Sequence, residues 1–153
     1  MKKLFTICLA VTLMLCGCNK FKLYDGPDCF YFDPDKSSSI NIADSGEIDA
    51  EYYVHYTGKR ATQTNEVTFS ISVGNGLKEG VDYKLVTQSN TLNFKIGYTD
   101  LAIRIKWLPH DIDESKDNTV TLTLDSVNNP NAVLGMPGPA CNYRSIKIIK
   151  YKY

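Results

Sequence analysis

The sequence predicts an all-β protein, a sandwich of two sheets built from about seven strands. Apolar and polar side chains alternate in residues 67–73, 101–107 and 119–124, as they do along a strand with one buried and one exposed face. Turn-forming residues separate these runs, and no apolar stripe with helical spacing follows residue 17. One core is expected to contain the inward side chains of the three runs, namely Phe69, Ile71, Ile103, Ile105, Trp107, Leu122 and Leu124.

The first residues have the composition of a cleaved secretory leader. Lys2 and Lys3 follow the initiating methionine, and residues 4–15 form an apolar run that is too short to cross a bilayer as a helix. Gly17 then supplies the small residue that precedes a cleavage site. Residues 1–17 are therefore predicted to be a signal peptide.

The junction after Gly17 resembles the lipobox of bacterial lipoproteins, in which the cysteine behind the cleaved bond receives the lipid. The resemblance places Leu15 at position minus three and makes Cys18 the acylated N-terminus. Cys16 matches this pattern less well because the bulky Leu15 precedes it. A plain secretory signal and an uncleaved anchor are the alternatives.

The mature chain is predicted to form a single domain. Residues 18–28 would be the lipidated N-terminus and a tether, and residues 29–153 the β-sandwich, a length that supports one hydrophobic core. The chain has 17 basic and 17 acidic residues, and the leader removes two lysines, which leaves 15 basic residues. This balance does not favour binding to nucleic acid or electrostatic adhesion to anionic lipid, so the lipid is the expected link to the membrane.

Shorter alternating patterns predict further strands, in chain order at Phe30 and Phe32, at residues 52–56, at Leu92 and Phe94, and at Ile146 and Ile148. Residues 33–50 are rich in Asp, Ser and Gly and are expected to be a loop with at most one weak strand, around Ile40 and Ile42. Residues 128–139 are expected to be a long connection.

Two cysteines remain in the predicted domain. Cys8 and Cys16 leave with the leader and lipidation occupies Cys18, so Cys29 and Cys141 are left, one near each end of the domain sequence. An oxidising compartment would allow them to form a disulfide, worth about 4 kcal/mol on the chain-entropy model. Two unrelated thiols are the alternative, because sequence spacing does not fix the Cα separation that a disulfide needs.

Three short motifs follow one another in the middle of the chain: Gly-Val-Asp-Tyr at residues 80–83, the run at residues 91–99, and the acidic turn at residues 111–114 with the strand after it. Together they resemble the Calx-β family of immunoglobulin-like sandwiches. Residues 23–26 and 30–33 look like the start of Calx-β-like lipoproteins of Bacteroidota, which are commonly encoded beside SusC/SusD-type glycan-uptake systems. The resemblance implies an immunoglobulin-like sandwich and a role in carbohydrate utilisation.

Some Calx-β domains bind calcium through carboxylates at one end of the sandwich, which makes Asp111, Asp113 and Glu114 candidate ligands. Read as an EF-hand loop, however, this run has Lys116 at the glycine position and Leu122 where the bidentate glutamate should be. We therefore expect weak or no calcium binding and no other cofactor. A solvated polar turn is the simpler interpretation of these residues.

The sequence contains no residue pattern typical of an enzyme. Its two histidines are His55 and His110, and the neighbouring side chains of His110 and Asp111 would point apart in an extended chain. A nucleophile elbow, a zinc-protease motif and a Cys-x-x-Cys motif are all missing from the sequence. We predict that the protein is not an enzyme and that both histidines lie at the surface.

Tyrosine is the remaining functional signal, because the chain has ten tyrosines and one small core cannot bury them all. Tyr53 is expected to share an outer face with His55, since both alternate with Tyr52 and Val54. Tyrosine rings stack on sugars and also serve protein interfaces, so Tyr53, Tyr143 and Tyr151 are candidate ligand-facing aromatics. The alternative is that they are ordinary strand residues.

These observations favour a non-catalytic lipoprotein of the outer membrane that serves as an accessory binding or assembly module of a glycan-uptake system. Its expected partners are the membrane, reached through the lipid, and either transporter components or a glycan. A structural or adhesive surface sandwich, stiffened by calcium, is the alternative. The periplasmic and the cell-surface face of the outer membrane are both open at this point.

Overall fold

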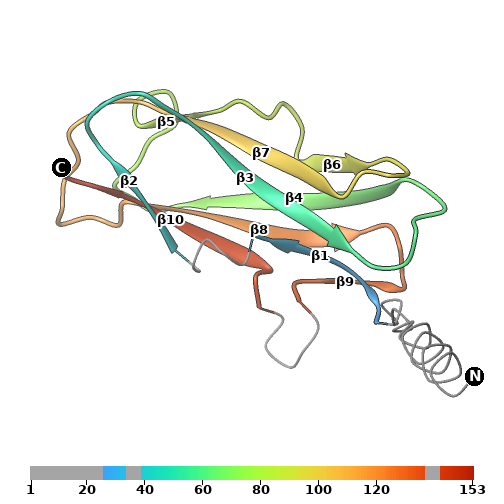
Figure 1. The fold of residues 1–153 in the computed structure, drawn as a ribbon. Coiled ribbons are helices and arrows are strands. Elements are labelled where there is room, and N and C mark those ends of the chain that lie inside the picture. The colour runs from blue at the N-terminus through green and yellow to red at the C-terminus, as the bar shows by residue number, and fades with distance from the viewer. Residues whose placement is uncertain (1–25, 34–38, 137–141) are drawn as a thin grey trace, which may run out of the picture.

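Two five-stranded sheets face each other across one hydrophobic core (Figure 1). The computed structural model describes residues 26–33, 39–136 and 142–153. All the regular elements in these residues are strands, which confirms the predicted all-β sandwich. None of the described residues belongs to a helix long and apolar enough to span a bilayer.

The strands alternate between the sheets as the chain proceeds. Sheet A contains, in spatial order, β5 (Tyr83–Leu85), β7 (Asp100–Trp107), β3 (Ile48–Thr57), β1 (Asp28–Phe32) and β9 (Ala132–Leu134). Sheet B contains, in spatial order, β2 (Ser39–Ala43), β10 (Ser145–Tyr151), β8 (Thr119–Val127), β4 (Asn65–Val73) and β6 (Thr91–Phe94). Neighbouring strands are antiparallel except for β1 with β9 and β2 with β10, which are parallel.

The described residues form ten strands, where the alternating patterns had predicted about seven. β2 coincides with the weak strand expected around Ile40 and Ile42. β5 and β9 have only three residues each, too few to establish an alternating pattern, and both lie at the edges of sheet A. Short edge strands offer little unpaired backbone to other chains, which protects the sandwich from edge-to-edge association.

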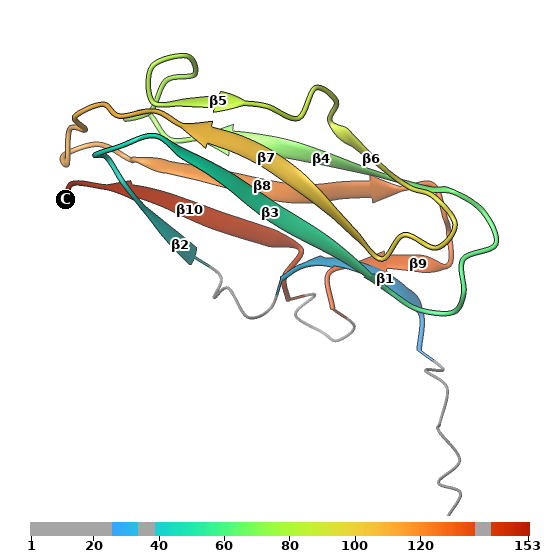
Figure 2. The same ribbon diagram turned by 45° about the horizontal axis from the view of Figure 1, so that its top comes forward.

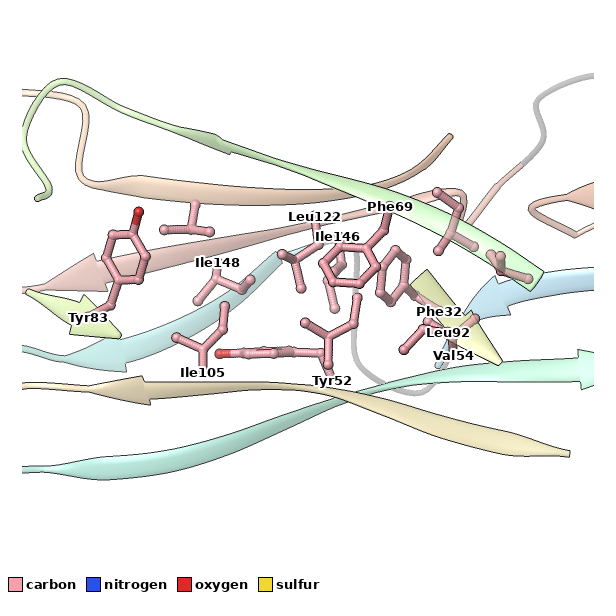
Figure 3. Packing of buried hydrophobic residues seen from close by; sticks show 14 of the residues in the cluster. Phe32, Tyr52, Val54, Phe69, Tyr83, Leu92, Ile105, Leu122, Ile146 and Ile148 are labelled. Carbon is pink, nitrogen blue, oxygen red and sulfur yellow. The ribbon is translucent and has the colours of Figure 1, made fainter. Parts of the chain in front are cut away.

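The core lies between the sheets and contains the residues that the alternation predicted. Phe69, Ile103, Ile105, Leu122 and Leu124 are buried, and the side chains of the two sheets meet as Figure 3 shows. Ile71, further along β4, is partly buried against the same cluster. The predicted register of these strands is therefore confirmed.

Trp107 is fully buried at the end of β7, and its ring nitrogen finds a partner inside the core. The Nε1 group donates a hydrogen bond of 2.9 Å to the hydroxyl of Tyr52 on β3. Burial raises the pKa of Tyr52 to about 12, although the bond from Trp107 acts in the opposite direction. Both polar groups are thus satisfied without access to water.

The long axis of the sandwich runs along the strands and has two distinct ends (Figures 1 and 2). The N-terminal end is where β1 begins at Asp28, next to the β3–β4 connection at residues 58–64, because Cys29 pairs with Thr57. The β6–β7 connection at residues 95–99 lies at the same end, since Asp100 pairs with His55. The C-terminal end carries the connections at residues 44–47, 74–82 and 108–118, together with the end of β10.

Candidate functional site

The outer face of sheet A, which points away from the core, carries the candidate functional site. Tyr53 and His55 lie on this face because they alternate along β3 with the buried Tyr52 and Val54. β1 extends the face, since Tyr31 lies directly opposite His55 in the antiparallel pair. Tyr53 and His55 therefore share one outer face, as the sequence predicts.

We call Tyr31, Tyr53 and His55 the aromatic platform. The ring centroids of Tyr31 and His55 are 5.8 Å apart, and those of Tyr53 and His55 are 6.4 Å apart with an angle of 26° between the planes. Tyr53 is 38% exposed, and Tyr31 is half-buried. The three rings thus lie next to one another on the outer face of sheet A.

Hydrogen bonds from neighbouring side chains fix both tyrosine rings. The hydroxyl groups of Tyr31 and Thr57 are 2.9 Å apart, and the hydroxyl of Tyr53 donates to Glu51 at 2.5 Å. The second carboxylate oxygen of Glu51 lies 2.9 Å from Nε of Arg104 on β7. The bond between Tyr53 and Glu51 raises the pKa of the phenol and lowers the pKa of the carboxyl group.

His55 is oriented by an acid on the neighbouring strand. Its Nδ1 is hydrogen-bonded to Asp100, whose other carboxylate oxygen accepts a bond of 2.6 Å from the hydroxyl of Thr99. The bond from Thr99 lowers the pKa of Asp100 most, and the bond to His55 lowers it further. Burial alone would raise this pKa. The remaining ring nitrogen of His55, Nε2, is shielded from solvent and has no hydrogen-bond partner among the described residues.

A shallow hollow continues the site along the same strands. It has a volume of about 300 Å³ and is lined by Asp49, Glu51, Val86 and Arg104, among others. The chain after β5 closes one side of it, because the amide of Val86 donates a 2.9 Å bond to the carbonyl of Arg104. The aromatic platform and the hollow share Glu51, which is hydrogen-bonded to Tyr53. Together they offer ring faces, a carboxylate and a guanidinium group to one ligand.

A second cluster of charges lies at the C-terminal end, and its central pair, Lys150 and Asp82, is buried. Nζ of Lys150 is 3.1 Å from Asp82 and 3.0 Å from the carbonyl of Leu108. Asp82 also accepts a 2.9 Å bond from the amide of Lys78 and lies 3.0 Å from Nδ1 of His110. Burial by itself raises the pKa of Asp82, but these partners outweigh it and lower the pKa below 3.8. The cluster joins the two sheets, because Lys150 belongs to β10 of sheet B and Asp82 immediately precedes β5 of sheet A.

The acidic candidates for calcium lie in the connection between β7 and β8. Asp113 accepts bonds from the amide and the hydroxyl of Ser115, at 3.0 and 2.6 Å, and lies 3.3 Å from Nζ of Lys116. The structure brings Asp111 and Glu114 into the same exposed turn. In the described part of the chain, no group of three or more His, Cys, Asp or Glu side chains is placed to hold a metal ion.

The three tyrosines proposed from the sequence do not come together. Tyr151 follows the buried Lys150 on β10, so its side chain lies on the outer face of sheet B. This face is on the opposite side of the sandwich from Tyr53. Tyr143 is half-buried next to β1, where its carbonyl accepts a bond of 2.8 Å from the amide of Phe32. It also has a positive φ of 62°. Only Tyr53 belongs to the aromatic platform.

Two predicted covalent features involve residues outside the described part of the chain. Cys18, the expected lipidation site, lies there, and so does Cys141. The potential partner of Cys141, Cys29, is 2% exposed, with its sulfur 3.4 Å from the carbonyl oxygen of Thr57. The disulfide and the lipidation therefore stay predictions.

Sequence reasoning missed four polar residues that complete the site. Alternation along β1, β3 and β7 places the side chains of Tyr31, Glu51, Asp100 and Arg104 on an outer face. The sequence does not disclose, however, that these three strands are neighbours or which residues pair. The register between β3 and β7, with His55 opposite Asp100 and Glu51 opposite Arg104, is a tertiary property.

The chain matches no protein-family model and no curated protein. Its fold is similar to that of a Bacteroides ovatus protein of unknown function, whose crystal structure comes from structural genomics. The TM-score is 0.52 and the sequences are 13% identical, over 84% of this chain and 47% of that one. The present chain therefore spans about half of the length of that protein, and the likeness concerns the fold alone.

Proposed function

We propose that this protein is a non-catalytic lipoprotein of the outer membrane, anchored through Cys18, that serves as an accessory binding module of a glycan-uptake system. The aromatic platform, set beside Glu51 and Arg104 on an exposed sheet face, carries the proposal. The lipobox resemblance at residues 15–18 supports the anchor. The resemblance to Calx-β-like lipoproteins supports the link to glycan uptake.

The chemistry of the platform suits a carbohydrate. A sugar ring presents C–H groups on its faces, which pack against aromatic rings, and hydroxyl groups at its edge, which bond to carboxylate and guanidinium groups. The exposed ring of Tyr53 and the charged pair of Glu51 and Arg104 would supply both kinds of contact. Because hydrogen bonds already hold the tyrosine rings, binding would cost little side-chain entropy.

The same geometry supports a binding role over a catalytic one. A histidine and aspartate pair needs a nucleophile or a bound water within reach of the free ring nitrogen to act as a general base. In the described residues, the Nε2 atom of His55 has no hydroxyl or thiol partner, and that atom is shielded from solvent. We therefore assign Asp100 the role of orienting His55 within the aromatic platform.

A glycan array with the purified mature protein tests the binding role. Tyr53→Ala should abolish the signal of the wild type, whereas Tyr151→Ala should preserve it, because Tyr151 is equally exposed on the opposite face. Equal glycan binding by both variants would show that the aromatic platform is not the binding site. Hydrolysis of a polysaccharide by the wild-type protein would contradict the non-catalytic role.

Metabolic labelling with palmitate in a bacterial host tests the anchor. The wild type should incorporate the label, and Cys18→Ala should not, since the thiol of Cys18 is the proposed acceptor. Cys16→Ala is the matched control and should be labelled like the wild type. Equal labelling of the Cys18→Ala protein would contradict lipidation at this residue.

Affinity purification from solubilised native membranes separates the assembly role from the alternative. Co-purification of an outer-membrane transporter would support an accessory module of an uptake system. If no transporter co-purifies and the glycan array gives no signal, the structural or adhesive sandwich is favoured. Calorimetry with calcium then tests whether such a sandwich is stiffened by calcium. If it is, Asp113→Ala should abolish calcium binding.

A further inference from the structure

We propose that the N-terminal end of the sandwich rests on the membrane surface, with the loops at residues 58–64 and 95–99 in contact with lipid. We call these two segments the N-terminal loops. The inference rests on the proposed lipid anchor at Cys18 and goes beyond it, because an anchor on a tether does not by itself bring any protein surface to the bilayer. Position, exposed side chains and charge all point to the same end.

The position of the N-terminal loops follows from the strand pairing. Asp28 is the first residue of β1, and its carboxylate accepts a 3.0 Å bond from the amide of Lys59 in the first loop. Asp28 lies ten positions after Cys18, a distance of at most about 35 Å in a fully extended chain. The lipid would therefore enter the bilayer close to these loops.

The second loop carries two of the most exposed large apolar side chains among the described residues. Ile96 is 56% exposed and Tyr98 is 51% exposed, and only Tyr153, at the opposite end, is more exposed. A tight turn holds the two side chains outward, because the amide of Tyr98 bonds to the carbonyl of Lys95 at 2.9 Å and Gly97 has a φ of 90°. An aliphatic side chain beside a tyrosine is typical of segments that enter the interface of a bilayer.

The near-neutral net charge of the chain hides an uneven distribution between the two ends. The N-terminal loops contain Lys59, Arg60 and Lys95 and no acidic residue. The connections at the C-terminal end, residues 44–47, 74–82 and 108–118, contain eight acidic residues and two lysines; two of the acids, Asp44 and Asp82, are buried, and the end of β10 with the residues after it adds Lys150 and Lys152. Anionic lipid would attract the first end and repel the second, and this difference fixes the orientation.

The two N-terminal loops also leave a hollow between them. It has a volume of about 350 Å³, and its lining includes Tyr56, Arg60 and Tyr98. A cationic side chain at the rim and aromatic rings in the wall suit a lipid headgroup with its phosphate. Asp28, Glu66 and Asp100 are acids near this end; Asp28 is bonded to the Lys59 amide and to Asn129, and Asp100 to His55 and Thr99.

Quenching by brominated lipid tests the orientation directly. The full mature lipoprotein is reconstituted into vesicles of brominated phosphatidylcholine and phosphatidylglycerol, as Tyr98→Trp and as the matched control Tyr153→Trp. Trp107 is fully buried and contributes the same background to both proteins. The tryptophan at position 98 should lose most of its fluorescence relative to non-brominated vesicles, and the one at position 153 should be unaffected.

Flotation of the same vesicles separates failure of this inference from failure of the anchor. If the protein floats with the vesicles but position 98 is not quenched, or if both positions are quenched equally, the proposed orientation is wrong and the anchor stands. If the protein does not float, the anchor and the orientation are both wrong. Arg60→Gln with Lys95→Gln should weaken the quenching at position 98, whereas Lys116→Gln with Lys152→Gln should not.

Discussion

Lys150 places an ammonium group between the two sheets, with 1% of the residue exposed. Taking a charge out of water is costly unless partners replace the lost hydration. Asp82 and the carbonyl of Leu108 supply that replacement for Lys150, and the Lys78 amide and His110 satisfy the carboxylate in turn. The alternation of β10 predicts an inward position at residue 150, but the paired acid lies far away in the sequence and could not be foreseen.

Removing one member of this buried pair should be strongly destabilising. Lys150→Met keeps a long apolar side chain but leaves Asp82 without its ammonium partner, so the free energy of unfolding should fall by about 3–5 kcal/mol. Lys147→Met, on the exposed side of the same strand, is the control and should change it by less than about 0.5 kcal/mol. Urea denaturation followed by tryptophan fluorescence measures both. A small loss in Lys150→Met would mean that the pair contributes little.

The lowered pKa of Asp82 also predicts a pH dependence. In the unfolded chain Asp82 titrates near its ordinary value of 3.8, so the unfolded state binds more protons than the folded state as acid is added. The stabilisation is fully present above that value and is lost as the pH falls through the lower, folded pKa. Urea midpoints measured down to about pH 3 should fall steeply for the wild type and less steeply for Asp82→Asn. If the urea midpoints of the wild type and Asp82→Asn fall equally with pH, the lowered pKa of Asp82 is not the cause of the acid sensitivity.

Trp107 gives an independent check of the core. The ring is fully buried and its Nε1 group is bonded to Tyr52, so acrylamide should scarcely quench its fluorescence in the native protein. Tyr52→Phe leaves a buried donor without a partner and should lower the free energy of unfolding by about 1–3 kcal/mol. A tryptophan that acrylamide quenches freely in the native state would refute the predicted register of β7.

At the scale of elements, regular alternation was enough to identify β4, β7 and most of β8. β8 also shows where this reasoning ends, because Leu124 pairs with Phe69 and Ser126 with Thr68, which leaves Asp125 as an extra residue. The bulge returns Val127 to the inner face, where simple alternation would have turned it outward. Bulges depend on the partner strand, so the pattern of one strand does not reveal them.

Neighbouring residues of β8 provide a matched pair for testing the sheet. Leu122 points into the core and is fully buried, while Thr121 points to the outer face and is half-buried. Leu122→Ala should lower the free energy of unfolding by about 2–5 kcal/mol, because it removes apolar contacts and leaves a cavity. Thr121→Ala should have little effect. Chemical denaturation compares them, and equal losses would show that the two faces are wrongly assigned.

The disulfide between Cys29 and Cys141 is a prediction about how two elements are joined. The chain on either side of residues 137–141 lies beside β1, since the amide of Gly135 bonds to Phe30 and the amide of Phe32 bonds to Tyr143. Mass spectrometry of the oxidised mature protein after thiol alkylation should find neither cysteine modified. Reduction should then lower the free energy of unfolding by about 4 kcal/mol on the chain-entropy model. Alkylation of both thiols without reduction would exclude the bond.

At the scale of the whole molecule, the sequence predicted the architecture better than the site. Period-two patterns report which face of a strand is dry, so sheets and core followed from them. A binding face depends on which strands are neighbours, and nothing local to β3 reveals that β1 and β7 flank it. Tyr53 and His55 were therefore predicted on one face, but their companions Tyr31, Asp100 and Arg104 emerged only from the register.

The two proposals assign different parts of the surface to different tasks. The aromatic platform lies on the outer face of sheet A, and the loops proposed to touch lipid lie at the N-terminal end, where Thr99 in the second loop is hydrogen-bonded to Asp100 beside His55. A sandwich standing on its N-terminal end would hold the platform roughly perpendicular to the bilayer.

The position of β10 also constrains the order in which the sandwich can form. This strand follows the other nine described strands along the chain, yet it lies inside sheet B between β2 and β8, and it carries Lys150 to its buried acid. Until β10 has docked, β2 has no neighbour among the described strands, and Ile146 and Ile148 are missing from the core. Sheet B is therefore expected to close only after the segment through Tyr151 is present, and chains that lack β10 would be left open to proteolysis.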